Sequence, residues 1–537
     1  MRTNPQYQWH GTIIFVTMLI VTLFIITPAW QIHDDTYYAM LADGYGILDR
    51  PVNAVPYMHP IIGAILNSIR SIGVRYTYAS YLIICILLGS AAVSYRLIKD
   101  RQGLDAWLLM TAGIAPFLLL LQYTAVAGFL VACAAVLWTG RREAQPTLNE
   151  WVFGALLILL AMFFRPTMVA IAAACLFPVL VWDARSRSVL NRAWVLGFLL
   201  AMLIVVLLYV PSSNWFADTR LVEFYRLNGP MAKLMNYGYI EAIRNFSTKL
   251  PTGITKNDID ILGTWFFGDR DLIEPKLMFQ LTEIANHESI IKARQLRAFE
   301  YFKSLPESIF FWFLLAALWL SMFSKLRGGL LFGIGLFVLF SVISAALLKP
   351  FPERVAGGIT FGLFMLAVVT LRDKPNTGGQ PWSSFSRYVA FALIVPAAFN
   401  IASDRLKLRY AAQDWTRDVQ VLQAEGRVYS FAGEIPLRAG YRPFHVGRLP
   451  PRIIFLGSMF LLPEIRDEEM ANGCGGFLEC LASGRRTALV ASQYKVDLLR
   501  ILMQERYGKL LEVVRKTERP SFTLYILSVN DTKRPSL

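Results

Sequence analysis

Long apolar segments alternate with short polar connections over the first 403 residues of the chain. At a rise of about 1.5 Å per residue, a helix of ~20 such residues spans the ~30 Å hydrocarbon core of a bilayer. The pattern therefore predicts about eleven transmembrane helices, over residues 12–30, 77–95, 104–120, 122–139, 151–164, 167–182, 194–210, 308–324, 329–348, 355–371 and 388–403.

Two longer polar stretches, residues 31–76 and 211–307, interrupt this pattern and are expected to be external loops. After residue 403 the pattern changes to short strand-like runs around one helical segment, residues 496–507. The sequence therefore predicts a polytopic α-helical membrane protein, residues 1–403, with a C-terminal soluble α/β domain, residues 404–537.

The charges between the apolar segments predict the orientation in the membrane. Lys and Arg accumulate in cytoplasmic connections. With Arg2 placed inside, the N-terminus is cytoplasmic and the C-terminal domain lies outside the membrane. Segments 151–164 and 167–182 are short, and if they form one broken helix every later connection changes side. The clusters that alternate to one side are Arg96, Lys99 and Arg101; Arg141 and Arg142; Arg185, Arg187 and Arg192; Lys325 and Arg327; and Arg372 and Lys374.

Composition agrees with a multispanning protein. Of the 537 residues, 55% are hydrophobic and 17% are charged, which is too apolar for a soluble domain of this length. The net charge of +15 comes from short basic clusters between apolar runs. These clusters indicate topology signals and contact with anionic membrane lipids, and we expect no nucleic-acid partner.

The first external loop opens with adjacent carboxylates, Asp34 and Asp35, directly after a charge-free segment. Carboxylates at the mouth of a membrane helix are costly to desolvate, which favours a chemical role. One of the two is expected to be a general base for an acceptor hydroxyl, an effect of roughly 10²–10⁴-fold. The alternative is that both only cap a helix beginning near Thr36. Nearby side chains of the loop, expected to bind substrate, are His33, Tyr38 and His59.

Three cations are predicted on the same outer side. Arg165 interrupts an apolar hairpin, while Lys349 and Arg354, with Glu353, lie in a proline-rich turn between two membrane segments. Arginine offers a planar fork and lysine a point charge for a phosphate leaving group. The alternative is that these side chains simply extend to the lipid interface.

Two cysteines fall in a glycine-rich stretch of the external domain, Cys474 and Cys480. An oxidising exterior favours a disulfide between them, with two unpaired thiols as the alternative. The other cysteines lie inside apolar segments, where cysteine acts as a small hydrophobic residue.

Short motifs resemble the GT-C superfamily of integral membrane glycosyltransferases. The acidic pair after the first helix is one, and the outer turn at residues 121–125 is another. Pro352-Glu353-Arg354 looks like the P-x-R segment of the protein mannosyltransferase and aminoarabinose transferase branches. Three stretches resemble the C-terminal region of uncharacterised bacterial members: residues 435–437, 441–443 and 452–456.

The resemblance implies inverting transfer of a sugar from a polyprenyl-phosphate donor to a cell-envelope acceptor outside the cytoplasmic membrane of a bacterium. This acceptor is a glycan, a lipid or a protein. It also implies that an acidic residue of the first loop is the base. His33 precedes the pair and no Glu follows it, so the choice between Asp34 and Asp35 stays open.

Other chemistry lacks its motifs: there is no Walker-type phosphate loop, H-E-x-x-H or dinucleotide fingerprint. We predict no metal ligand set, although a single divalent cation on Asp34 or Asp35 stays open, because oxygen-rich sites leave little trace in a sequence. Two other functions also stay open, a polysaccharide polymerase or ligase and a transporter (flippase) of lipid-linked sugars.

Overall fold

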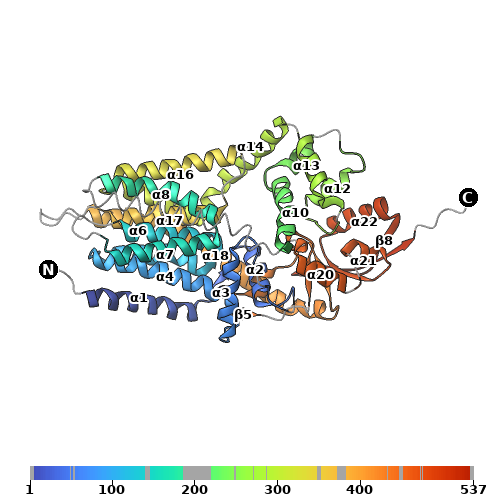
Figure 1. Ribbon diagram of the computed structural model, residues 1–537, viewed down its shortest axis with the longest axis horizontal. Coiled ribbons are helices and arrows are strands. Elements are labelled where there is room, and N and C mark those ends of the chain that lie inside the picture. Colours follow the sequence, from blue (N-terminus) through green and yellow to red (C-terminus); the bar gives the residue numbers. More distant parts are fainter. Residues whose placement is uncertain are drawn as a thin grey trace, which may run out of the picture.

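The computed structural model describes most of the chain as an elongated molecule (Figure 1). Apolar helices form a bundle at one end, and the C-terminal domain lies at the other. The description covers residues 5–48, 50–52, 55–139, 146–185, 219–246, 250–269, 271–285, 287–347, 352–371, 382–431, 433–446, 452–471, 473 and 476–531.

The bundle is built from helices that coincide with every predicted apolar segment lying in the described residues; segment 194–210 lies outside them. Helix α1 ends before residue 30, because Pro28 disfavours helix at the residue before it. The bundle helices are α1 (Pro5–Ile25), α4 (Thr77–Lys99), α5 (Leu104–Leu119), α6 (Tyr123–Trp138), α7 (Leu148–Phe164), α8 (Pro166–Arg185), α15 (Ile309–Ser321), α16 (Arg327–Leu347), α17 (Glu353–Val369) and α18 (Trp382–Gln423).

By length and composition, three helices in the described part of the chain are long and apolar enough to cross a membrane: Thr77–Lys99, Arg327–Ala345 and Phe385–Gln423. Helices α14 and α15 join at a 73° bend and make a fourth if they are counted as one span. Most other bundle helices are apolar but shorter. Helices α7 and α8 pack against each other as a hairpin that breaks at Arg165, rather than forming one long helix.

Helices α6 and α17 form the centre of the bundle, and every residue of α6 is buried. They cross where Gly128 faces Gly358, and a Cβ added to Gly358 would lie 2.3 Å from backbone atoms of Gly128. Only glycine permits this approach. The crossing brings the first residues of both helices, including Tyr123 and Arg354, to the same end of the bundle.

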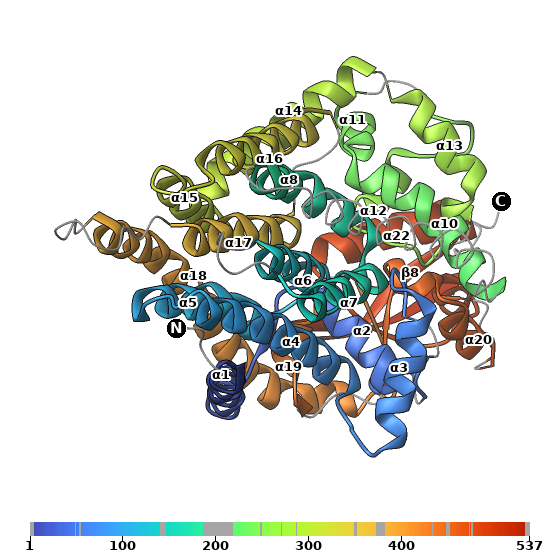
Figure 2. The same ribbon diagram turned by 60° about the vertical axis from the view of Figure 1, so that its left-hand side comes forward.

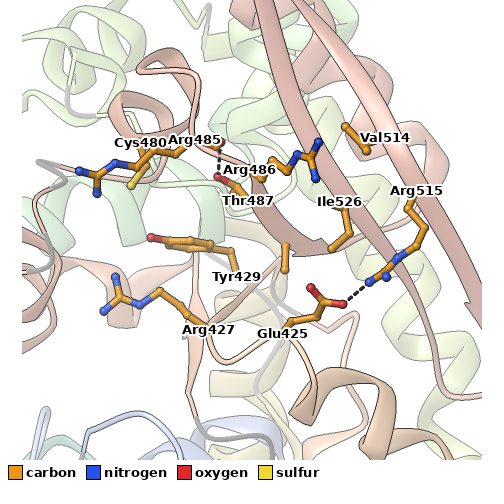
Figure 3. A pocket seen from close by; sticks show the side chains of 11 residues that line it. Glu425, Arg427, Tyr429, Cys480, Arg485, Arg486, Thr487, Val514, Arg515 and Ile526 are labelled. Carbon is orange, nitrogen blue, oxygen red and sulfur yellow. Dashed lines mark hydrogen bonds and ion pairs between the residues drawn. The ribbon is translucent and has the colours of Figure 1, made fainter.

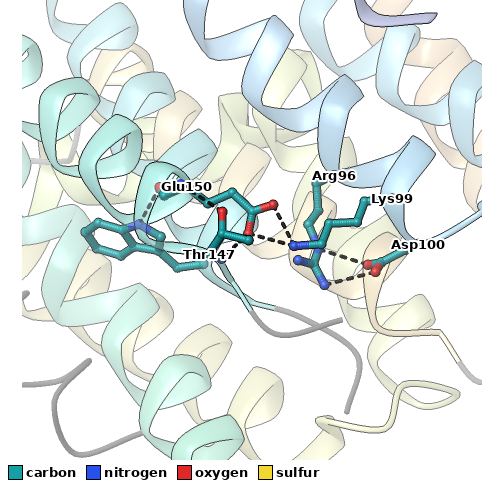
Figure 4. Close-up of polar contacts among 6 residues, drawn as sticks. Arg96, Lys99, Asp100, Thr147 and Glu150 are labelled. Carbon is teal, nitrogen blue, oxygen red and sulfur yellow. Dashed lines mark hydrogen bonds and ion pairs between the residues drawn. The ribbon is translucent and has the colours of Figure 1, made fainter. Parts of the chain in front are cut away.

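At the opposite end, one ion pair closes the last turn of α4 and a second joins α4 to α7 (Figure 4). Arg96 bonds Asp100 with both side chains fully buried, and Lys99 donates to Glu150 at 2.6 and 2.8 Å. Glu150 also completes a capping box with Thr147 at the start of α7. These pairs fix the end of the bundle that is distant from the C-terminal domain.

The first loop lies between the bundle and the C-terminal domain (Figures 1 and 2). It contains β1 (Ala29–Trp30), α2 (His33–Asp43) and α3 (Pro60–Ser71). Strand β1 pairs in parallel with β2 (Leu120–Leu121), which places the start of α2 beside the start of α6. Helix α2 ends at Gly44, whose φ of +64° is a left-handed conformation that favours glycine.

The second long loop forms helices that flank the C-terminal domain (Figure 2). They are α10 (Thr219–Asn236), α11 (Tyr239–Phe246), α12 (Lys256–Leu262), the 3₁₀ turn Asp271–Ile273, α13 (Pro275–Ile284), α14 (His287–Ser304) and the 3₁₀ turn Leu305–Glu307.

The C-terminal domain is an α/β unit, as predicted. Its five-stranded sheet has the order β6-β3-β7-β9-β8, with β6, β3 and β7 parallel and the other two pairings antiparallel. The elements are β3 (Val428–Ser430), α19 (Leu437–Gly440), β4 (Tyr441–Arg442), β5 (His445–Val446), β6 (Ile453–Phe455), the 3₁₀ turn Ser458–Leu461, α20 (Pro463–Ala471), α21 (Phe477–Ala482), β7 (Thr487–Val490), α22 (Gln493–Tyr507), β8 (Lys509–Arg519) and β9 (Phe522–Asp531).

The predicted boundary between residues 403 and 404 falls inside α18, which continues for 42 residues from the bundle into the domain. Polar contacts fix the domain on the first loop. The Tyr441 hydroxyl donates to Asp43 at 2.7 Å, and Arg438 donates to the Trp30 carbonyl at 2.8 Å. The domain is therefore held against the first loop near both ends of α2.

Candidate functional site

A cavity of about 660 Å³ lies where the first loop, the bundle, α10 and the C-terminal domain meet. The C-terminal domain contributes residues that end or follow β3 and β6, where ligands usually bind to parallel sheets. The lining residues are His33, Asp34, Tyr37, Tyr38, Tyr57, Tyr123, Arg165, Asn228, Gly229, Ala232, Lys233, Asn236, Tyr237, Trp265, Arg354, Gly433, Phe455, Gly457 and Ser458.

The adjacent carboxylates have different environments. Helix α2 begins at His33, three residues before the predicted start, and its N-cap is Ile32. Asp34 and Asp35 therefore lie in the first turn, where a helix favours negative charge, and neither is the N-cap. The Asp34 side chain lines the cavity and is 46% exposed, whereas Asp35 is fully buried.

Asp35 instead joins three helices. Its Oδ1 accepts from the Tyr78 hydroxyl at 3.1 Å and from the backbone N–H of Tyr123, the first residue of α6, at 3.2 Å. Its other oxygen, Oδ2, is buried without a hydrogen-bond partner. Burial raises the pKa of Asp35 well above its usual value, with the nearby Asp34 adding to the effect. Asp35 therefore holds the three helices together, and Asp34 is the candidate base.

Two predicted cations, Arg354 and Arg165, line the cavity together with Asp34. An Arg354 nitrogen is 3.6 Å from Asp34 Oδ2, and the arginine side chain is 30% exposed. Arg165, at the break between α7 and α8, lies over the rings of Tyr57 at 5.4 Å and Tyr123 at 6.0 Å. No carboxylate pairs with Arg165 among the residues that the structure describes, so its guanidinium is available to an anion.

Lys233 is a third cation of the cavity, and sequence reasoning missed it. It lies on α10 with Asn228, Gly229, Ala232 and Asn236, whose helical spacing turns one face of α10 toward the cavity. Its ammonium is 5.8 Å from the centre of the Tyr239 ring. Lys233 is far from the acidic pair in sequence, and only the tertiary fold of the second loop brings it here.

Two aromatic residues of the cavity have left-handed backbone conformations: Tyr57, with φ of 64°, and Trp265, with φ of 60°. Such conformations are uncommon for bulky residues and concentrate at functional sites. Tyr57 is held by Tyr225, whose hydroxyl accepts from its N–H at 2.9 Å, and by Asn228, which donates to its hydroxyl.

Other predicted substrate-binding residues divide between the cavity and the scaffold. His33 and Tyr38 line the cavity, and burial lowers the pKa of His33 and raises that of Tyr38. His59 is not among the lining residues. It caps α3, where its Nδ1 accepts from the N–H of Ile61 at 3.2 Å.

Glu353 lies beside Arg354 in the proline-rich turn but is not among the residues that line the cavity. Its Oε1 accepts from the Ser308 hydroxyl at 3.1 Å and from the N–H of Ile309 at 3.0 Å. It therefore ties the start of α15 to the start of α17. Lys349, the third predicted cation, lies outside the described residues.

No cysteine is among the described residues that line the cavity. Cys480 is disulfide-bonded, but its predicted partner Cys474 lies outside the described residues. Cys85, Cys133 and Cys175 are buried free thiols. Within the described ranges no three His, Cys, Asp or Glu side chains are grouped as metal ligands, and Asp34 is the one acidic residue lining the cavity there.

Comparison with known proteins adds no assignment. No protein-family model matches the chain, and neither does any curated protein or solved structure.

Proposed function

We propose that the protein is a membrane glycosyltransferase that moves a sugar from a polyprenyl-phosphate donor to a cell-envelope acceptor outside the cytoplasmic membrane. The observation that supports this most is the pairing of one exposed carboxylate, Asp34, with Arg354 in a cavity that also contains Arg165 and Lys233. A base and cations for a leaving phosphate are what such a transfer requires.

In the proposed reaction, the acceptor hydroxyl gives its proton to a carboxylate oxygen of Asp34 while its oxygen attacks C1 of the donor sugar. The bond between C1 and the phosphate oxygen breaks on the opposite face, so the configuration at C1 inverts. The bonding electrons leave with the polyprenyl phosphate. Arg354, Arg165 and Lys233 neutralise its charge, with the arginine forks suited to phosphate oxygens.

The architecture of this proposal is GT-C-like, with about eleven spans, a cytoplasmic N-terminus and an external C-terminal domain. The apolar bundle would admit the polyprenyl tail from the bilayer. The cavity lies at the end of the bundle that adjoins the C-terminal domain, where lipid-linked and water-borne substrates meet. A transporter would instead place its ionisable residues near the bilayer midplane.

Purified protein in lipid vesicles tests the proposal. Each of a panel of radiolabelled polyprenyl-phosphate sugars is supplied with envelope glycan or lipid acceptors. Transfer of label from the lipid to an acceptor, with release of polyprenyl phosphate, supports a glycosyltransferase. Movement of the intact lipid-linked sugar across the bilayer without transfer would contradict it and assign a flippase instead.

A further inference from the structure

A second cavity, of about 720 Å³, lies in the C-terminal domain, and four arginines and a single glutamate line it (Figure 3). It opens beside the amino ends of β3 and β7, whereas the first cavity adjoins the carboxyl ends of β3 and β6. The two cavities therefore lie at opposite ends of the parallel strands of one sheet. The polar lining residues are Glu425, Arg427, Tyr429, Arg485, Arg486, Thr487 and Arg515.

Two of the arginines are held in place by carboxylates. Arg427 contacts Glu469 at 2.9 Å, and the same glutamate accepts from the Tyr429 hydroxyl at 2.6 Å. Arg515 pairs with Glu425 (Figure 3). Arg427 also lies 3.9 Å from a carboxylate oxygen of Glu468. A guanidinium has five N–H donors, so these carboxylates leave donors for a ligand while fixing the orientation of the group.

Arg486 differs from these two. It is exposed, and among the described residues no carboxylate pairs with its guanidinium. It directly precedes β7, and Arg427 directly precedes the neighbouring parallel strand β3 (Figure 3). An unpaired guanidinium next to oriented ones forms a cationic surface that matches a carboxylate or phosphate.

The sheet is locally deformed at this cavity. Successive strand residues normally point to opposite faces, yet Val514 and Arg515 both line it. The pairing of β8 with β9 shifts between Val513 and Arg515, so Val514 is the extra residue of a β-bulge. Bulges re-aim side chains and are frequent beside binding sites. Here the bulge directs Arg515 into the cavity.

We propose that this arginine cavity binds an acidic glycan, through the carboxylates of its sugars, as the distal part of the acceptor. The inference rests on the proposed function for the identity of the acceptor. Its volume falls in the range of small-molecule sites, which is enough for a short oligosaccharide. Its position, at the end of the parallel strands away from the first cavity, suits a polymer whose reacting end lies at Asp34.

Binding of trigalacturonate to the full-length protein in detergent tests this without any donor. We expect Arg486→Ala to weaken binding at least about tenfold, the loss typical of a charged hydrogen bond, and Arg486→Lys to weaken it less. Arg500→Ala is the matched control, because Arg500 is an exposed arginine of α22 outside the cavity. Neutral maltotriose is expected not to bind, and added salt is expected to weaken trigalacturonate binding.

Equal affinity of wild type and Arg486→Ala for trigalacturonate, or equal binding of maltotriose, would overturn the proposal. Inorganic phosphate that competes at lower concentration than trigalacturonate would overturn the carboxylate assignment in favour of a phosphate ligand. If the protein binds trigalacturonate through Arg486 but transfers no sugar, the proposed function is refuted and the binding site stands. If it transfers sugar but does not bind trigalacturonate, the binding site is refuted and the proposed function stands.

Discussion

Asp34 and Asp35 are neighbours in sequence but have opposite environments in the fold. Asp34 is in the cavity beside Arg354, and Asp35 is buried against Tyr78 and the start of α6. The sequence predicted the pair as a site but left the choice between them open. Which of the two faces the cavity depends on the direction of α2 and on the pairing of β1 with β2, and no local sequence pattern encodes either.

Arg354 is expected to act on the donor more than on the acceptor. Arg354→Ala should raise the KM for the polyprenyl-phosphate sugar at least about tenfold, because a charged hydrogen bond to the phosphate is lost. Arg354→Lys keeps the charge without the fork and should give an intermediate value. Steady-state kinetics with donor and acceptor varied in turn measure the KM for each substrate. An unchanged donor KM in Arg354→Ala would remove this residue from the phosphate site.

Asp35 should make stability depend on pH in a direction opposite to that of a salt-bridged carboxylate. Its pKa is raised in the folded protein above the usual 3.8, so the folded state favours the protonated form. This contribution to stability is present below about pH 4 and is lost as the pH rises through the folded-state pKa. Asp35→Asn cannot titrate. We expect the Tm of wild type to fall relative to that of Asp35→Asn between pH 4 and 8, and a constant difference would contradict this.

At the scale of elements, α6 and α17 set the position of the site, since their crossing brings Tyr123 and Arg354 to one end. Gly358→Ala places a Cβ against the backbone of Gly128 on a rigid helix, so the helices must separate. We expect a loss of about 1–3 kcal/mol, as for other overpacked cores. Thermal unfolding in detergent measures it.

Gly335→Ala is the matched control, because Gly335 also lies inside a bundle helix but an added Cβ meets no atom within 4 Å. Alanine is the better helix former by about 0.5–1 kcal/mol, so this variant should be as stable as wild type or more so. Equal destabilisation by both substitutions would show that the close crossing is not the cause.

Apolar periodicity predicted the positions of the bundle helices well, because burial and helix formation leave a local pattern. Only three of the described helices, or four if the bent pair is one span, are long and apolar enough to cross a membrane. The site was predicted in part. Asp34, Arg165 and Arg354 come together, but Lys233 lies on a loop helix whose tertiary position the sequence does not indicate. Glu353 and His59 were predicted to bind substrate, but both accept hydrogen bonds from backbone N–H groups at the starts of helices. The same polar side chains serve as helix caps and as substrate-binding groups, so the sequence does not separate the two roles.

For the whole molecule, the orientation in the membrane is the prediction with the widest consequences. Leu104→Cys, at the exposed start of α5, should react with an impermeant maleimide only in inside-out vesicles. Arg500→Cys, in the C-terminal domain, should react only in right-side-out vesicles. The reason is that lysine and arginine clusters remain cytoplasmic. Labelling of both positions from the same side would contradict an odd number of spans between them.

The central claim is that Asp34 is the base of a sugar transfer, and one comparison tests it most directly. Transfer rates are measured for wild type, Asp34→Asn, Asp35→Asn and Asp497→Asn in the same vesicles. Asp497 is the control, since it is 47% exposed and pairs with an arginine, much as Asp34 does at 46%.

We expect Asp34→Asn to lower the rate by roughly 10²–10⁴-fold with an unchanged Tm, the loss expected of a general base. We expect Asp35→Asn to keep most of the activity, because Asn retains the size and the hydrogen-bond acceptor of a protonated carboxyl. Asp497→Asn should transfer sugar at the wild-type rate. Transfer by Asp34→Asn at the wild-type rate would contradict the role of Asp34 as the base.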